Sequence, residues 1–357
     1  MTAVVLRLLC AAAALVTLAG CGAAGPGPAA PADDHEGVLG TEPSDPPAES
    51  PPGPYGVRLD VLENHTVLHS VEGQSFPIPA GTSYVLRTPT GWLYGTATGP
   101  VTLLTPDGAT HSLAAVVDQQ SLEMPGAPAV SADGTRIAWA EGDTVHTGQI
   151  TASGIQDVRS SPVPAGTYPK VWTGERVILG RSYEGGCCGH RPAEYDVWDP
   201  AAGDFVPHWT RQLSPVYGPV PVGAPLVGVT EGDPGGDSCL ARLDGVRDLS
   251  ATASTCRPGL NVGSLMWTIA PDGRHLVELV DSVPTMIDLT TLTLMDACPG
   301  EQPLLWEDNR TVLIAGPGTP STDGGTSHVF RCTVDGESEE VPGLVVGANL
   351  TLVPRLG

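Results

Sequence analysis

The chain has 357 residues, and its 40 Asp and Glu outnumber its 17 Lys and Arg, which gives a formal net charge of −23. This balance excludes a non-specific nucleic-acid binder and a domain lying flat on anionic lipid, because both need clustered positive charge. Only 5% of the residues are aromatic, and 45 Gly and 36 Pro separate short Val, Leu, Ile and Thr runs. That pattern is typical of an all-β chain with many turns.

The N-terminal segment has the pattern of a secretory signal. Arg7 is the only charged residue before position 33, and it precedes an apolar run from Leu8 to Leu18 that is too short to cross a bilayer comfortably. The next residues, Leu18-Ala19-Gly20-Cys21, resemble the lipobox of bacterial lipoproteins. The resemblance implies that residues 1–20 are a signal peptide and that Cys21 is diacylated and anchors the chain to a membrane. A plain signal peptide with an incidental cysteine is the alternative.

Residues 21–54 form a second region, made mostly of Gly, Ala, Pro and acidic residues after Cys21. The segment has no apolar periodicity, and it carries too little apolar surface to offset the entropy that ordering would cost. We therefore expect a disordered tether with a reach of about 30 Å. It would hold the remaining domain, residues 55–357, clear of the lipid.

An internal repeat with a period of about 44 residues runs through the rest of the chain. Each copy has a short apolar segment, a turn and a second apolar segment. Two copies have a clear Asp-Gly turn, namely Ala129–Trp139 and Met266–Val277. Two copies are weaker, namely Val171–Leu179 and Leu305–Leu313. Two copies lack the turn signature, namely Val85–Leu93 and Pro219–Val229. A period of this length, with about four strands per unit, indicates a β-propeller.

The clearest copy, Ala129–Trp139, is similar to the WD40-like PD40 repeat of TolB-type propellers. This resemblance implies one propeller fold but no particular activity, because propellers carry many unrelated functions. The segment Asn349–Val353 has no hairpin partner after it, and Val57–Pro79 lacks a first strand. We therefore predict that the C-terminal strand completes the N-terminal blade and closes a ring of seven four-stranded blades.

Three connections between the second and third strands of a blade are long and rich in glycine. Such connections lie on one face of a propeller, and insertions that collect on one face mark the binding face of a repeat protein. The connections are Ser182–Ala193, Glu231–Ser238 and Gly316–Ser327, and the candidate binding residues in them are Gly185, Gly186, His190, Glu231, Asp233, Asp237 and Asp323.

Six cysteines remain once Cys10 is removed with the signal and Cys21 is acylated. An even number in an exported chain indicates disulfides. Cys239 opens a third strand and Cys256 ends the fourth, so an antiparallel hairpin would bring them together. Cys298 and Cys332 belong to adjacent blades and pair by elimination.

Cys187 and Cys188 are left, within the run Gly185-Gly186-Cys187-Cys188-Gly189-His190. Adjacent cysteines can form a strained vicinal disulfide, which flanking glycines tolerate and which would stiffen the loop for recognition. Two alternatives stay open. The two cysteines can bridge to other cysteines, or they can act as redox-active thiols or, with His190, as metal ligands, although neighbouring cysteines chelate one ion poorly.

Two further groups of residues have a structural and a functional interpretation. The acidic side chains of Glu231, Asp233 and Asp237 can supply oxygen ligands to calcium, but their spacing matches no known calcium loop, and we favour solvated surface charge. Trp172, Trp267 and Trp306 recur at the end of the innermost strand of their repeats. Recurrence at one structural position favours packing between blades over stacking on a ligand in the channel.

These features predict a lipid-anchored, extracytoplasmic propeller that acts as a non-catalytic binding or scaffolding module at the cell envelope. The expected partner is another envelope or extracellular protein, or a glycan. We expect a monomer that needs no cofactor and touches the membrane only through its anchor. The alternatives are an exported propeller enzyme, a hydrolase or lyase acting on glycan, lactone or peptide, and a redox sensor that uses Cys187 and Cys188.

Overall fold

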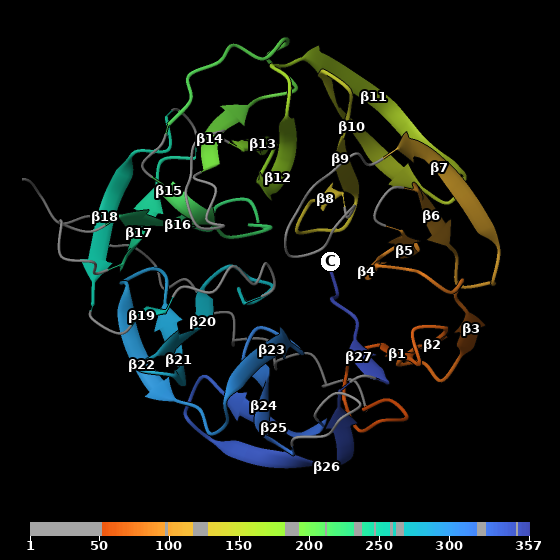
Figure 1. Ribbon diagram of the computed structural model, residues 1–357, viewed down its shortest axis with the longest axis vertical. Coiled ribbons are helices and arrows are strands. Elements are labelled where there is room, and N and C mark those ends of the chain that lie inside the picture. Colours follow the sequence, from red (N-terminus) through yellow and green to blue (C-terminus); the bar gives the residue numbers. More distant parts are fainter. Residues whose placement is uncertain are drawn as a thin grey trace, which may run out of the picture. The chain divides into compact units, whose positions relative to one another are not determined.

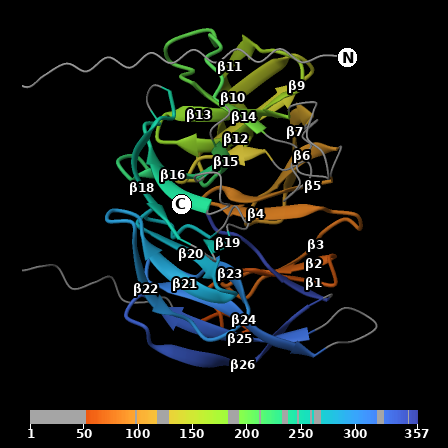
Figure 2. The same ribbon diagram turned by 60° about the vertical axis from the view of Figure 1, so that its left-hand side comes forward.

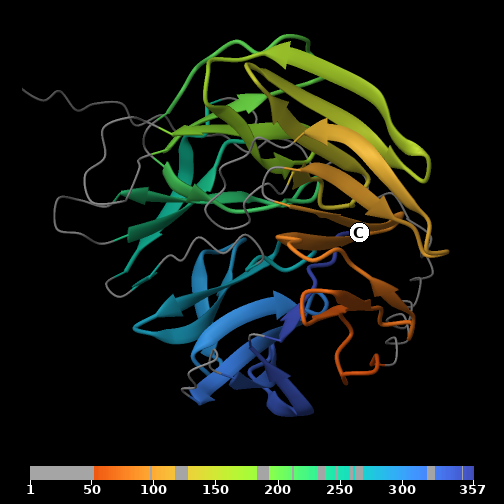
Figure 3. The ribbon, with the colours of Figure 1, turned by 45° about the vertical axis from the view of Figure 1, so that its right-hand side comes forward.

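The computed structural model describes residues 52–96, 99–116, 128–182, 193–210, 213–231, 238–245, 248–257, 260–261, 268–319, 326–347 and 349–357. These residues form seven antiparallel sheets arranged as the blades of a propeller (Figure 1). Views turned by 60° and 45° show the blades as separate twisted sheets that face one another around the ring (Figures 2 and 3). The predicted all-β, seven-bladed fold is confirmed.

The blades follow one another in chain order, and the first-named strand of each is the innermost. Blade 1 contains β27 (Leu350–Leu352), β1 (Val61–Glu63), β2 (Val67–His69) and β3 (Ser75–Pro77). Blade 2 contains β4 (Tyr84–Thr88), β5 (Gly91–Gly95), β6 (Pro100–Leu104) and β7 (Thr110–Val116). Blade 3 contains β8 (Ala129–Val130), β9 (Arg136–Glu141), β10 (Thr144–Thr151) and β11 (Gly154–Pro162).

The other four blades follow in the same way. Blade 4 contains β12 (Thr167–Thr173), β13 (Arg176–Ser182) and β14 (Ala193–Trp198). Blade 5 contains β15 (Leu213–Val216), β16 (Leu226–Glu231), β17 (Ser238–Leu243) and β18 (Ala251–Cys256). Blade 6 contains β19 (Leu260–Asn261), β20 (His275–Val280), β21 (Val283–Asp288) and β22 (Thr293–Ala297). Blade 7 contains β23 (Gln302–Trp306), β24 (Thr311–Thr319), β25 (Thr326–Thr333) and β26 (Ser338–Val346).

The two clear copies of the repeat share one turn between the first and second strands of their blades. In blade 3, Gly134 has a φ of 67° and donates its N–H to the carbonyl oxygen of Ser131. In blade 6, Gly273 has a φ of 71° and donates in the same way to Ala270. Glycine suits both positions because it adopts a positive φ without a steric cost.

The ring closes as predicted, because β27 pairs antiparallel with β1 and becomes the innermost strand of blade 1. The chain then continues beyond the predicted closure. Arg87 of β4 donates its backbone N–H to Pro354 and accepts a backbone hydrogen bond from Leu356, and Gly357 donates to Ala132 in blade 3. The C-terminal segment therefore links blades 1, 2 and 3 near the centre of the ring (Figure 1).

Two details of the predicted blades were wrong. Blade 4 has three strands instead of four, and within residues 199–210 a single backbone bridge, from Thr210 to Tyr195, joins the segment after β14 to that strand. Pro200 and Pro207 lie in that segment and lack the N–H groups that a fourth strand would need. The repeat predicts Pro219-Val220 as the inner strand of blade 5. In the structure that strand is Leu213–Val216, and Val220 instead donates its N–H to the carbonyl oxygen of Trp172 in blade 4.

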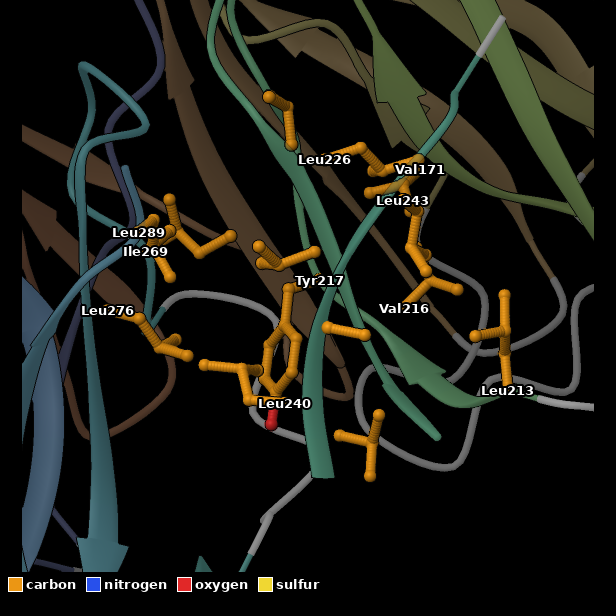
Figure 4. Close-up of a cluster of buried hydrophobic side chains, with 14 of the residues drawn as sticks. Val171, Leu213, Val216, Tyr217, Leu226, Leu240, Leu243, Ile269, Leu276 and Leu289 are labelled. Atoms are coloured by element: carbon orange, nitrogen blue, oxygen red, sulfur yellow. The ribbon is translucent and has the colours of Figure 1, made fainter. Parts of the chain in front are cut away.

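Hydrophobic side chains fill the spaces between neighbouring sheets. In one such cluster, Val171 of blade 4, Leu226 and Leu240 of blade 5 and Leu276 and Ile287 of blade 6 are all buried (Figure 4). Strand residues alternate between the two sides of a sheet, so each blade contributes to the clusters on both sides. The propeller is therefore held by contacts between blades that are neighbours in the ring, and these include blades 7 and 1.

Candidate functional site

One face of the propeller carries the connections from the second to the third strand of each blade and from the fourth strand to the next blade, and we call it the loop face. A cavity of about 410 Å³ lies on this face, at the centre of the ring between blades 7, 1 and 2. We call it the mouth pocket. Its lining comes from the inner strands β23, β27 and β4 and from the segments at their ends on the loop face (Figure 1).

The described lining of the mouth pocket is mainly apolar. Leu304, Val346 and Leu350 are half-buried, so part of each side chain is open to solvent. Leu305 and Leu352 are buried in the wall. Gln302, Ser83, Thr351 and His65 are exposed and supply polar groups, and the described lining holds no carboxylate.

His65 reaches the loop face because of a tight hairpin turn between β1 and β2, whose end residues Glu63 and Val67 pair with each other. Asn64 and His65 have φ values of 51° and 54°, and Thr66 donates its N–H to the carbonyl oxygen of Glu63 over 3.0 Å. This is the type I′ geometry that joins two short antiparallel strands. The turn fixes His65 beside the end of β27, at the edge of the mouth pocket.

Tyr84 of β4 also belongs to the wall, and its phenol is buried. Its hydroxyl oxygen has no hydrogen-bond partner among the described residues, and burial raises the pKa of the phenol, which therefore stays neutral. A Cβ atom on Gly95 would lie 2.5 Å from that oxygen. Glycine at position 95 is thus required to accommodate Tyr84.

The C-terminal segment separates the mouth pocket from the other face. A second cavity, of about 40 Å³, lies at the opposite end of the channel and is lined by Ala132, Pro271, Arg355 and Leu356. Leu305 and Pro354 border both cavities. The chain after β27 therefore forms the floor of the mouth pocket, which opens towards the loop face.

The three long connections join the second and third strands of their blades, as the sequence predicts. The strands on either side of them are β13 and β14, β16 and β17, and β24 and β25, and the facing ends of these strands lie on the loop face, as the mouth pocket does. The third is shorter than expected, because β24 extends to Thr319 and β25 begins at Thr326. Glu231 ends β16 opposite Ser238. The other candidate residues lie outside the described residues; they are Gly185, Gly186, Cys187, Cys188, His190, Asp233, Asp237 and Asp323.

The two disulfides among the described residues are the pairs that the sequence favours. Cys239 and Cys256 face each other in the hairpin of β17 and β18, with an S–S distance of 2.01 Å. Cys298 follows β22 of blade 6, and its sulfur lies 2.10 Å from that of Cys332 in β25 of blade 7. The first disulfide fastens one blade, and the second joins two adjacent blades.

The recurrent tryptophans pack between blades. Trp172 donates its Nε1–H to the carbonyl oxygen of Ala129 over 3.1 Å, and Trp306 donates to Thr268 over 2.8 Å. In both cases the acceptor belongs to the preceding blade. Both indole rings are buried, and Trp306 also borders the small cavity at the opposite end of the channel, whereas Trp267 lies outside the described residues.

Among the described residues, no group of three or more His, Cys, Asp or Glu side chains is placed to hold a metal ion. The suggested calcium ligands Asp233 and Asp237 lie outside that part of the chain. The described residues also include no helix that is long and apolar enough to cross a membrane.

One cluster in blade 1 has the arrangement of a nucleophile, a base and an orienting carboxylate. His69 Nδ1 lies 2.9 Å from Ser75 Oγ, and His69 Nε2 lies 2.9 Å from Glu63 Oε2. The three residues stand on the neighbouring strands β3, β2 and β1. None of them lines the mouth pocket or the cavity at the other end of the channel.

The sequence did not reveal the mouth pocket. Its described walls come from Leu62, His65 and residues 82–85, 302–305, 346–347 and 350–354, which include segments far apart in the chain. The available signal was the consecutive apolar pair Leu304-Leu305 in an inner strand. Successive strand residues point to opposite sides of the sheet, so two consecutive leucines cannot both pack against the same neighbouring blade.

No protein-family model matches the sequence, and no curated protein matches it. Solved propeller structures resemble the fold at low identity. The β-propeller domain of the Trilobed protease from Pyrococcus furiosus is 8% identical, with 77% of this chain and 85% of that chain covered and a TM-score of 0.47. A putative TolB from Agrobacterium tumefaciens is 11% identical, with 83% and 98% covered and a TM-score of 0.38. A hypothetical selenium-binding protein from Sulfolobus tokodaii is 10% identical, with 83% and 92% covered and a TM-score of 0.43. The chain is a seven-bladed β-propeller with structural neighbours that include TolB, and this likeness concerns the fold alone.

Proposed function

We propose that the chain is a lipid-anchored, extracytoplasmic binding module whose ligand enters the mouth pocket on the loop face. The observation that carries this proposal is the pocket itself. It is open at one end, closed by the C-terminal segment at the other, and lined by apolar side chains that water solvates poorly. A rigid ring of blades presents these side chains in a fixed arrangement, which lowers the entropic cost of binding.

The location at the cell envelope rests on three features of the chain. The residues that precede Cys21 resemble a lipobox, and the tether would keep the propeller clear of the lipid. Two disulfides support an oxidising compartment, because cytosolic thiols are usually kept reduced. The partner that binds the loop face would be an envelope or extracellular protein, or a glycan. The propeller would bind it as a monomer.

The anchor can be tested by replacing Cys21. In a bacterial host fed a radiolabelled fatty acid, the unchanged chain should incorporate label and sediment with membranes, whereas Cys21→Ser should do neither. Cys10→Ser is the matched control, because Cys10 lies within the expected signal and should leave labelling intact. Equal labelling of the Cys21→Ser and unchanged chains would overturn the anchoring at Cys21.

A hydrolase is the second candidate function, and the Ser75–His69–Glu63 arrangement is the observation that favours it. In such a reaction Ser75 Oγ would attack an acyl carbonyl while His69 Nδ1 takes the hydroxyl proton. The bond from the carbonyl to its alcohol or amine would then break, with His69 passing that proton to the departing group, and water would hydrolyse the acyl-serine and restore Ser75. A fluorophosphonate probe decides between the classes, because it labels activated serines. Labelling that disappears in Ser75→Ala would establish a nucleophile, whereas labelling no greater than that of Ser75→Ala would leave the binding module as the function.

A further inference from the structure

We infer that the mouth pocket binds a neutral, lipophilic small molecule. This inference rests on the proposed function and specifies the ligand class of the same site. Three properties of the pocket lead to it, namely its size, the chemistry of its walls and the absence of a counter-charge in its described lining.

The size fits a small molecule larger than a single ring. Ligand pockets commonly measure about 300–1,000 Å³, and an apolar cavity of about 150 Å³ already holds benzene. At about 410 Å³ the mouth pocket has room for two fused or linked rings or a chain of similar volume. The floor formed by Pro354 limits how deeply such a molecule can enter.

The walls favour an apolar ligand. Leu304, Val346 and Leu350 are half-buried and come from β23, β26 and β27, so they approach the pocket from two blades. A lipophilic ligand would cover the part of these side chains that faces water, which is the driving force of apolar binding. Gln302 is exposed and can hydrogen-bond to a polar group left outside, whereas the Ser83 hydroxyl already donates to the carbonyl oxygen of Gly95.

The charges select a neutral molecule. The described lining contains no Asp, Glu, Lys or Arg in a position to pair with a charged ligand, apart from the imidazole of the exposed His65. Moving an unpaired charge into an apolar site costs more than the contacts return. The net charge of −23 also disfavours an anion, because the whole protein repels it.

Two fluorescent probes that differ by one charge test the inference. N-phenyl-1-naphthylamine is neutral, and 8-anilino-1-naphthalenesulfonate is a similar two-aryl amine that carries a sulfonate. Both should be titrated into the chain from Gly22 onward, which keeps the tether and every blade but lacks the acyl chains, so no detergent competes. We expect one site for the neutral probe and at least tenfold weaker binding of the sulfonate.

Substitutions then locate the site. Leu304→Glu places a carboxylate in the pocket and should weaken binding of the neutral probe at least tenfold. Val222→Glu is the matched control, because Val222 is 75% exposed in the connection from β15 to β16, on the opposite face. It should leave binding unchanged. Leu350→Ala, which removes apolar contact without adding charge, should weaken binding by a smaller factor and guards against misfolding of the first variant.

Three outcomes would overturn the inference. They are equal affinity for the two probes, tighter binding of the sulfonate, and neutral-probe binding that Leu304→Glu and Leu350→Ala leave unchanged while the urea midpoint shows intact folding. These results can be told apart from a failure of the proposed function. Loss of fatty-acid labelling concerns Cys21 alone, and probe binding by the unacylated chain does not depend on it.

Discussion

The indole Nε1–H of Trp172 donates a hydrogen bond to the carbonyl oxygen of Ala129, 3.1 Å away, across the boundary between blades 4 and 3. Trp306 of blade 7 makes the same kind of contact with the carbonyl oxygen of Thr268 in blade 6. Each of these side chains combines a large buried ring with a directed hydrogen bond to the neighbouring blade. They tie each of these inner strands to the blade before it.

Replacing Trp172 by Phe should lower the free energy of unfolding by about 1–3 kcal/mol, because the ring becomes smaller and the hydrogen bond to Ala129 is lost. Urea unfolding measures the change. Trp209→Phe is the control, since the Nε1 atom of Trp209 is buried without a partner among the described residues and its removal breaks no such bond. A loss as large in Trp209→Phe as in Trp172→Phe would contradict the role of the hydrogen bond.

The carboxylate of Glu307 should matter more than any surface ion pair. Its side chain is fully buried, and it accepts hydrogen bonds from Arg331 Nε over 2.6 Å and from the backbone N–H of Arg58 over 2.7 Å, which joins blade 7 to the start of the propeller. Glu307→Gln should cost about 3 kcal/mol, because it leaves the partly buried guanidinium of Arg331 with only the exposed carboxylate of Glu339 as a counter-charge.

Glu339 provides the matched control for that substitution. It binds the same guanidinium, at Arg331 Nη1 over 3.2 Å, but its side chain is 70% exposed. Exposed ion pairs contribute at most about 1 kcal/mol, so Glu339→Gln should shift the urea midpoint only slightly. Similar shifts of the urea midpoint in the two variants would show that burial does not determine how much Glu307 contributes to the free energy of unfolding.

Removing the disulfide between blades should destabilise the protein more than removing the one within blade 5. The sequence separations are 34 residues for Cys298–Cys332 and 17 for Cys239–Cys256. Loop-closure entropy then gives losses of about 4 and about 3 kcal/mol. Urea unfolding of the two double Cys→Ser variants tests this order, and the reverse order would show that native contacts outweigh chain entropy in this protein.

Protonation of the Asp133 carboxylate should contribute to the loss of stability in acid. Burial opposes its ionisation, but hydrogen bonds from Ser131 Oγ and from the N–H and hydroxyl of Thr135 outweigh that effect and lower its pKa. A carboxyl whose pKa is lower in the folded state stabilises the protein above its ordinary pKa of 3.8, and this contribution is lost as the pH falls through the folded value.

Asp133→Asn should therefore be less stable than the unchanged protein at pH 6, and the difference should shrink as the pH falls below 3.8. Urea midpoints measured between pH 6 and pH 3 give this difference directly. A difference that stays constant over the range would mean that the charge of Asp133 makes no contribution. A growing difference would reverse the sign of the expected effect.

The sequence by itself determined the features that depend on local pattern. The Asp-Gly turns at Gly134 and Gly273 and the regular spacing of apolar segments were enough to predict seven blades. The unpaired strand at Leu350–Leu352 was enough to predict how the ring closes. The hairpin geometry of Cys239 and Cys256 followed from their places at two strand ends. Each conclusion uses contacts whose partners are close in the chain or forced together by the repeat.

Only the tertiary structure decided the features that depend on departures from the repeat. Prolines removed the fourth strand of blade 4, and the segment around Val220 moved to the edge of that blade. The residues after Val353 entered the channel and formed the floor of the mouth pocket. Tyr84, Leu304 and Leu350 line the same pocket, and no periodic pattern in the sequence predicts that they lie close to one another. The pocket arises because ring closure brings the first, second and last blades together around one axis.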